Sequence, residues 1–266
     1  MIKNIVLGRY ISKISPVHSL DPRTKILSSF VFILAIFFVN SFWGYVLLAL
    51  ILISFIFLSS ISLLKYLESL KALWLLIILA FIFQLFSSNN GRVVLNLWIM
   101  KITSDGVYNA VFISLRLIFI LEMGAVLTFT TSPTQITDGL ESIFSPLKKL
   151  GFPSQEMAMM LSISLRFIPI LADETDRIMK AQASRGARFD TGGIIKRVKS
   201  FIPIIIPLLS SAIRHAQALA IAMESRCYRG GTGRTKFHIL RYRICDYLTY
   251  SIFMVSFICI VISRRL

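Results

Sequence analysis

The stretch VYNAVFISLRLIFILEMGAVLTFT, residues 107–130, decides the fold class of this chain. It exceeds the run of about 20 apolar residues that a helix needs to cross a bilayer. Its only charged residues are Arg116 and Glu122, and their spacing does not place them well on one helix face. We expect a membrane-spanning helix in which each charge packs against another helix or snorkels, with a substrate or proton relay as the alternative.

Four more apolar runs lie on either side of this stretch and bring the expected number of membrane-spanning helices to five. They are residues 25–42, 43–60, 72–86 and 247–262. The first two are separated by so few residues, none of them charged, that we expect a tight turn between them. Hydrophobic residues make up 56% of the chain, above the roughly 45–50% of soluble domains. The sequence therefore predicts an all-α integral membrane protein.

Positive charge sets the expected orientation. Lys and Arg number 29 against 13 Asp and Glu, a formal net charge of +16. They concentrate in residues 1–25, in the loop that holds Lys65 and Lys71, and in residues 131–246, which five spans place on one side. The positive-inside bias makes that side cytoplasmic. No nucleic-acid-binding motif accompanies the charge, so we interpret it as cytoplasmic loops beside anionic lipid rather than as a nucleic-acid site.

Four regions follow: a cytoplasmic N-terminal segment (1–25), transmembrane helices one to four (26–130), a cytoplasmic region (131–246) and a C-terminal transmembrane helix (247–266). The third region is too polar for a simple span and too periodic for a linker, and it predicts three long amphipathic helices. Ser132 and Gln135 form a capping box around Pro133 at the start of the first, and Gly151 is its stop. Its apolar positions are Ile136, Leu140, Ile143, Phe144, Leu147 and Leu150.

The second amphipathic helix is expected to begin near Ser154 and to kink at Pro169. The third is expected after residues 190–193, with bends available at Pro203 and Pro207. The second helix also carries three methionines, Met157, Met159 and Met160. Flexible methionines suit a surface that accepts several partners, and they equally suit an internal gap that must be filled.

Two similar tripeptides end these last two helices, and we call them the arginine ends. They are Ser184-Arg185-Gly186 and Ser225-Arg226-Cys227, each followed by a second arginine, Arg188 and Arg229. An arginine at a helix end can present its planar guanidinium to a carboxylate groove through two parallel hydrogen bonds. The simpler explanation is that a cation complements the negative end of the helix dipole. The repetition favours docking onto two matching grooves, with Arg188 and Arg229 as secondary docking residues.

These segments together resemble a known family over essentially the whole chain. Leu20-Asp21-Pro22-Arg23-Thr24-Lys25, the two arginine ends and Tyr228-Arg229-Gly230-Gly231 are similar to the transmembrane T component of energy-coupling factor (ECF) vitamin transporters, a family that includes EcfT and CbiQ. The family usually has Ala-Arg-Gly at the first arginine end, where this chain has Ser184. That change leaves the arginine in place.

The resemblance implies a non-catalytic scaffold in the cell membrane. The family's T component joins two ATP-binding-cassette ATPases, through arginines corresponding to Arg185 and Arg226, to a membrane S component that captures a vitamin. The arginines would insert into grooves of the ATPases, and the long cytoplasmic helices would cradle the S component. ATP-driven motion would then reorient the S component.

Other classes of function have weaker support. The chain has no Gly-x-x-x-x-Gly-Lys-Ser/Thr loop for ATP, and His18, His215 and His238 lack the spacing of a metal site or a catalytic triad. We expect no cofactor. A stand-alone secondary transporter would carry inverted repeats, and none is convincing among the spans. A membrane-embedded enzyme would cluster acidic and histidine residues at the membrane face. Co-purification with ATPases and a small membrane protein separates these possibilities from a scaffold.

Overall fold

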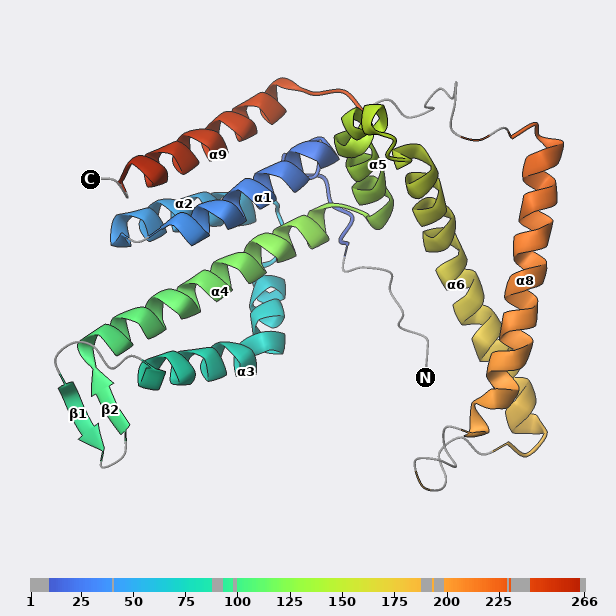
Figure 1. The fold of residues 1–266 in the computed structure, drawn as a ribbon, viewed down its shortest axis with the longest axis horizontal. Coiled ribbons are helices and arrows are strands. Elements are labelled where there is room, and N and C mark those ends of the chain that lie inside the picture. The colour runs from blue at the N-terminus through green and yellow to red at the C-terminus, as the bar shows by residue number, and fades with distance from the viewer. Residues whose placement is uncertain are drawn as a thin grey trace. The chain divides into compact units, whose positions relative to one another are not determined.

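A computed structural model describes residues 10–39, 41–87, 93–97, 100–187, 193, 199–228, 230 and 240–263. The chain divides into two compact units. One contains Leu140–Ile239, and the other contains Gly8–Gly139 together with Leu240–Leu266. Figure 1 shows the helices that dominate both units, with the chain coloured from blue at its N-terminus to red at its C-terminus. The expected all-α architecture is confirmed.

Among its described residues, the larger unit contains five long helices that pack as a bundle. They are α1 (Pro22–Phe38), α2 (Phe42–Leu58), α3 (Leu63–Ser87), α4 (Ser104–Thr130) and α9 (Ile244–Ser263). Helix α4 packs along α3 and also contacts α1 and α2, while α9 packs mainly on α1. The expected span at 72–86 is thus part of a longer helix, because α3 begins at Leu63 and has 25 residues.

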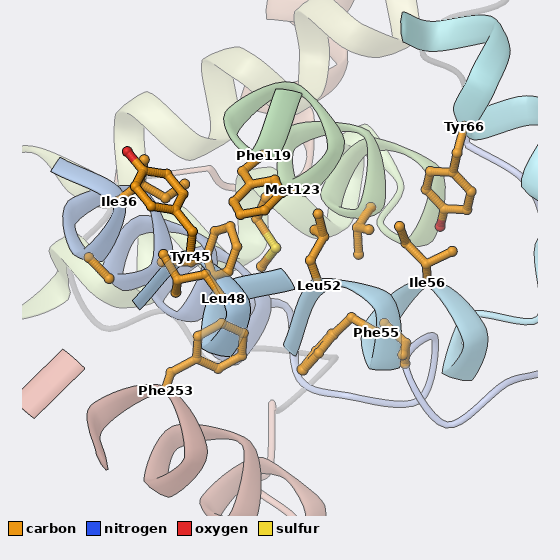
Figure 2. Packing of buried hydrophobic residues seen from close by; sticks show 14 of the residues in the cluster. Ile36, Tyr45, Leu48, Leu52, Phe55, Ile56, Tyr66, Phe119, Met123 and Phe253 are labelled. Carbon is orange, nitrogen blue, oxygen red and sulfur yellow. The ribbon is translucent and has the colours of Figure 1, made fainter. Parts of the chain in front are cut away.

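Aromatic and branched side chains fill the centre of this bundle (Figure 2). Phe253 of α9 meets Phe55 of α2 at 5.1 Å between ring centroids and Phe32 of α1 at 6.1 Å, both edge to face. Leu48 and Ile36 are completely buried beside them. Lipid is as apolar as these side chains, so close packing rather than water exclusion drives the association of helices in a bilayer. The interlocking rings supply that packing.

The connection between the first two spans is as short as expected. Helix α1 ends at Phe38 and α2 begins at Phe42. A Cβ atom on Gly44 would lie 2.9 Å from Cγ1 of Val39, closer than such atoms normally approach. Any other residue at position 44 would therefore require the Val39 side chain to shift.

A short hairpin, which the sequence analysis did not anticipate, leads into α4. Strand β1 (Val93–Leu97) pairs antiparallel with β2 (Met100–Thr103), and Val93 lies opposite Thr103. Thr103 is also the N-cap of α4, where its side chain accepts a hydrogen bond from the backbone N–H of Gly106 at 3.1 Å. The end of the hairpin thus serves as the start of the longest helix in the bundle.

Helix α5 (Pro133–Phe144) begins with the expected capping box. The N–H of Ser132 donates to Oε1 of Gln135 at 3.0 Å, and the N–H of Gln135 donates to Oγ of Ser132 at 3.3 Å. The prediction that this helix continues to Leu150 was wrong. It gives way to the 3₁₀ helix η1 (Ser145–Leu150), because Pro146 lacks the N–H that the α-helical ladder requires. Gly151 ends η1 with φ of +85°, as expected of a stop.

Helix α6 (Ser154–Ser184) begins where it was predicted and runs through Pro169 as one element. Helix α8 (Ile202–Ser225) contains Pro207. Residues 199 and 200 are helical, residue 201 is a turn, and Pro203 lies in the first turn of α8, so the helical path is interrupted beside Pro203, where a bend was expected. Residues 194–198, where the third amphipathic helix was expected to start, lie outside the described residues.

Five helices in the described part of the chain are long and apolar enough to cross a membrane: α3, α4, α6, α8 and α9. Mean hydropathy is 2.2, 2.2 and 1.9 for α3, α4 and α9, but 1.2 and 1.5 for α6 and α8. Helices α1 and α2, which were expected to span, have 17 residues each, at the lower end of the length that crosses a bilayer. Of the five long helices, α6 and α8, which were expected to be amphipathic, are therefore the least apolar.

Candidate functional site

The two arginine ends have the same backbone structure. Helix α6 ends at Ser184 and α8 ends at Ser225, so Arg185 and Arg226 both take the C-cap position. Their φ and ψ angles are −86° and 7° for Arg185 and −93° and 18° for Arg226. The residue after each arginine is left-handed, with φ of +88° at Gly186 and +56° at Cys227.

Matching hydrogen bonds close both ends. At α6, the N–H of Gly186 donates to Ala183 O at 2.9 Å, and that of Ala187 donates to Gln182 O at 3.0 Å. At α8, the N–H of Cys227 donates to Glu224 O at 2.9 Å, and that of Tyr228 donates to Met223 O at 3.0 Å. These pairs define a Schellman motif, which turns the chain sharply after the last helical residue. Both arginines are held on the same kind of rigid corner.

The side chains at the two ends also correspond. Ser184 Oγ donates to Lys180 O at 3.0 Å, and Ser225 Oγ donates to Ala222 O at 3.1 Å. Each serine is thus tied back to its own helix, while Arg185 and Arg226 are exposed. Neither guanidinium has a hydrogen bond or ion pair with another described residue. Arg188 and Arg229, predicted as secondary docking residues, lie outside the described residues.

Helices α6 and α8 pack against each other and run in opposite directions (Figure 1). Ser211 Oγ donates to Glu174 Oε1 at 3.4 Å, and the rings of Phe167 and His215 lie 6.1 Å apart. Arg185 is about 16 Å beyond Glu174 along α6, and Arg226 is about 22 Å beyond Ser211 along α8, at a rise of about 1.5 Å per residue. The antiparallel arrangement therefore puts the two arginines at opposite ends of the helix pair.

The same helix pair exposes many large apolar side chains. Met157 and Met160 are 43% and 59% exposed. They do not fill a gap inside this unit, which favours an adaptable surface over internal packing. Other exposed apolar residues of the pair are Leu161, Ile168, Ile170, Ile202, Ile205, Ile206, Leu209, Ile213 and Ile221. Large apolar side chains exposed in this number are typical of a contact with a partner or with lipid.

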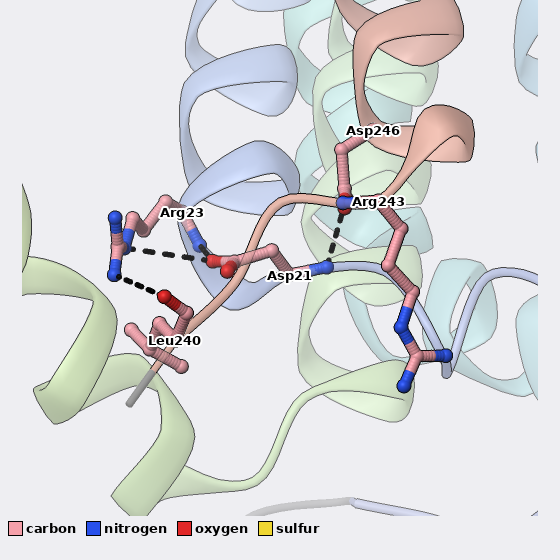
Figure 3. A network of polar contacts seen from close by, with 5 residues as sticks. All are labelled: Asp21, Arg23, Leu240, Arg243 and Asp246. Atoms are coloured by element: carbon pink, nitrogen blue, oxygen red, sulfur yellow. Dashed lines mark hydrogen bonds and ion pairs between the residues drawn. The ribbon is translucent and has the colours of Figure 1, made fainter. Parts of the chain in front are cut away.

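The other segment that carried the resemblance, residues 20–25, forms a polar junction in the larger unit (Figure 3). Asp21 caps α1 by accepting from the N–H of Arg23 at 2.9 Å. Asp246, in the first turn of α9, accepts from the N–H of Asp21 at 2.9 Å and from the N–H of Arg243 at 2.7 Å. Both carboxylates are buried. The junction joins the start of the first helix to the start of the last.

Arg23 and Lys25 complete this junction. The Arg23 side chain donates to Leu240 O at 3.3 Å, lies 3.7 Å from Asp21 and sits over the ring of Tyr242. Buried Lys25 donates to Thr130 O at 3.0 Å and so binds the C-terminal end of α4, where a cation is favoured. Sequence analysis identified the 20–25 segment but missed Asp246. The feature that could have indicated Asp246 is an acidic residue in the first turn of an otherwise apolar helix.

The two charges within α4 pack against neighbouring helices, as expected. Glu122 is buried, and its Oε1 lies 3.5 Å from Oγ of Ser69 on α3. The Arg116 guanidinium lies 5.6 Å from the ring centroid of Phe37 on α1. The charges contact different helices, so the structure does not bring them together into a relay.

Comparison with known proteins identifies relatives of nearly full length. A family model described as CbiQ, cobalt transport protein, matches residues 13–239. Proteins named energy-coupling factor transporter transmembrane protein EcfT are also similar. That of Acidaminococcus fermentans is 45% identical, covering 99% of this chain and 98% of the relative. That of Thermanaerovibrio acidaminovorans is 44% identical, covering 96% and 94%, and that of Bacillus subtilis is 40% identical, covering 90% and 91%.

Proposed function

Because the chain belongs to the family of energy-coupling factor transporter transmembrane proteins, we propose that it is the scaffold joining two ATP-binding-cassette ATPases to a vitamin-binding S component. One observation carries the proposal. Two exposed arginines project from identical helix ends, at opposite ends of one antiparallel helix pair. That arrangement fits two similar partners held side by side.

Each arginine docks into a carboxylate-lined groove of one ATPase. A guanidinium offers two parallel N–H donors that match a carboxylate, and the pair is strong when water is excluded. The Schellman turn supports this role because the rigid backbone reduces the ordering cost of binding. The helix dipole alone does not require two copies of the same turn.

The S component docks on the apolar surface of α6 and α8. Methionine and branched side chains accept differently shaped apolar partners, which suits a scaffold that serves more than one S component. ATP binding moves the two ATPases relative to each other, and this motion reaches α6 and α8 through Arg185 and Arg226. Since the two helices pack on each other, the force is transmitted to the S component. The positive charge of the loops supports a cytoplasmic position for this region.

The test is vitamin uptake by proteoliposomes that contain the co-expressed complex. Arg185→Ala, Arg226→Ala and the double variant are compared with wild type, and complex assembly is checked by co-purification. Losing charge-assisted hydrogen bonds worth roughly 1.5–3 kcal/mol weakens ATPase binding by about ten- to a hundredfold at each end. Arg185→Lys and Arg226→Lys keep the charge and lose the paired geometry, so they separate docking from the dipole effect.

Arg177→Ala and Arg214→Ala are the matched controls, because both arginines are exposed within the same two helices. We expect them to assemble and to transport normally. Full assembly and uptake by the Arg185→Ala/Arg226→Ala double variant would contradict the proposal. A chain that transports without ATPases would instead support a stand-alone secondary transporter.

A further inference from the structure

The end of α5 and the 3₁₀ helix that follows it expose three large apolar side chains. Phe144, Leu147 and Leu150 are 40%, 40% and 85% exposed. In a 3₁₀ helix, side chains three residues apart eclipse each other, so Leu147 and Leu150 lie along one face of η1. Phe144 is the last residue of α5, and its ring lies 5.8 Å from that of Phe152. An unbroken α-helix would have kept Leu147 and Leu150 in the apolar stripe of α5. In η1 both side chains are exposed.

Two lysines flank this apolar face. Lys148 and Lys149 occupy the last turn of η1, and both are exposed. The Lys148 ammonium donates to Oε1 of Gln155 at 3.0 Å, which holds its stem along the turn. We call Phe144, Leu147, Lys148, Lys149 and Leu150 the 3₁₀ corner. Leucine and phenylalanine beside a lysine pair are the composition of segments that bind at a membrane surface.

The chain length limits how far the 3₁₀ corner can lie from the C-terminal end of α4. Helix α4, a membrane-spanning candidate, ends at Thr130, and only α5 with its short connection precedes Ser145. A helix of this length covers about 18 Å. The corner is therefore within reach of the lipid surface on the side where α4 ends.

We propose that the 3₁₀ corner inserts into the headgroup region of an anionic leaflet and anchors the start of α6 there. Phe144, Leu147 and Leu150 enter the boundary with the acyl chains, and the lysines pair with lipid phosphates. A fixed start for α6 gives the helix pair a pivot on the membrane. The partner is a lipid surface, and docking on a membrane protein is the alternative that the test distinguishes.

The experiment introduces benzoylphenylalanine, a photo-crosslinking residue that attacks nearby C–H bonds, at position 144 or position 150 of the full chain. Position 145 is the control, because Ser145 is exposed on another side of the same turn. The chain is reconstituted alone, or with its co-purifying partners, in vesicles of phosphatidylglycerol or of phosphatidylcholine. Mass spectrometry then identifies the adducts.

We expect lipid adducts at positions 144 and 150 and at least severalfold fewer at position 145, with or without partners. In phosphatidylglycerol, the change Lys148→Gln/Lys149→Gln should reduce the lipid adducts at position 150 by about fivefold or more. The reason is that each lysine removed no longer attracts the segment to the anionic lipid surface. In phosphatidylcholine it should have little effect. Adducts to a partner protein in place of lipid, or no adduct at either position, would overturn the proposal.

Discussion

Cys227 occupies the same left-handed backbone position at one arginine end that Gly186 occupies at the other. A residue with a Cβ atom is strained there by about 1–2 kcal/mol, while glycine is not. Cys227→Gly should therefore stabilise the end of α8 and slow amide hydrogen exchange of Cys227 and Tyr228 by about fivefold or more. Gly186→Ala should do the opposite at Gly186 and Ala187. Faster exchange in Cys227→Gly would contradict the strain at Cys227.

His18 gives the segment before α1 a pH-dependent stability. Its Nε2–H donates to Ile11 O at 3.0 Å, and Nδ1 lies 2.7 Å from Ser15 Oγ, so the neutral ring satisfies both contacts. Burial lowers the pKa of His18 below its usual 6.5, and the positive charge of Lys25 lowers it further. The unfolded chain thus takes up a proton at a higher pH than the folded chain does. Stability contributed by the neutral ring is present above pH 6.5 and falls as the pH drops through this value.

The measurement for His18 is the thermal unfolding midpoint between pH 8 and pH 5, compared with His18→Gln. Glutamine keeps polar contacts and does not titrate, so the difference between the two proteins should change mainly below pH 6.5. A difference that stays constant over this range would show that the imidazole does not contribute to the pH dependence.

At the scale of elements, Asp246 joins α1 to α9 through two backbone N–H groups. Asp246→Ala removes both acceptors and leaves the N–H groups of Asp21 and Arg243 unsatisfied, at a cost of roughly 1–3 kcal/mol each. We expect a lower unfolding temperature and weaker protection of the first turns of α1 and α9. Asp105→Ala is the matched control, because Asp105 is also acidic in the first turn of an apolar helix but is exposed. Equal effects of the two changes would refute the junction.

Local signals predicted elements well where the residues concerned also interact locally. Ser132, Pro133 and Gln135 are neighbours in the chain, and the capping box formed as the sequence indicated. Asp21 and Asp246 meet only in the folded bundle, and no local pattern indicates which acidic residue will lie beside an N-cap. The end of α5 before Pro146 was not predicted, because the apolar residues keep helical spacing on both sides of this proline. Pro146 itself cannot continue the α-helical hydrogen-bond ladder.

At the scale of the whole molecule, apolar composition predicted an all-α membrane protein, and the helices and the relatives confirm it. Hydropathy could not say which long helices cross the bilayer, because α6 and α8 meet the same length and composition criteria as α9. The side of the membrane on which they lie remains a prediction from the basic loops. The docking role of Arg185 and Arg226 also remains a prediction, since grooves on partner proteins cannot be read from one chain.

The two compact units differ in how much their own packing stabilises them. In α6 only Ser154 and Ala158 are buried, and in α8 only Ile204 and Ser211, whereas eight residues of α1 are buried. Helices with few buried side chains open more readily, so α6 and α8 should exchange amide hydrogens faster than α1 and α4 in the isolated chain. If their exposed apolar surface binds partners, assembly should slow that exchange by about tenfold or more, while α4 serves as an internal standard. The measurement is hydrogen exchange followed by mass spectrometry on the chain alone and in complex, in the same lipid. Exchange in α6 and α8 that assembly leaves unchanged would mean that the exposed apolar surface is not where partners bind.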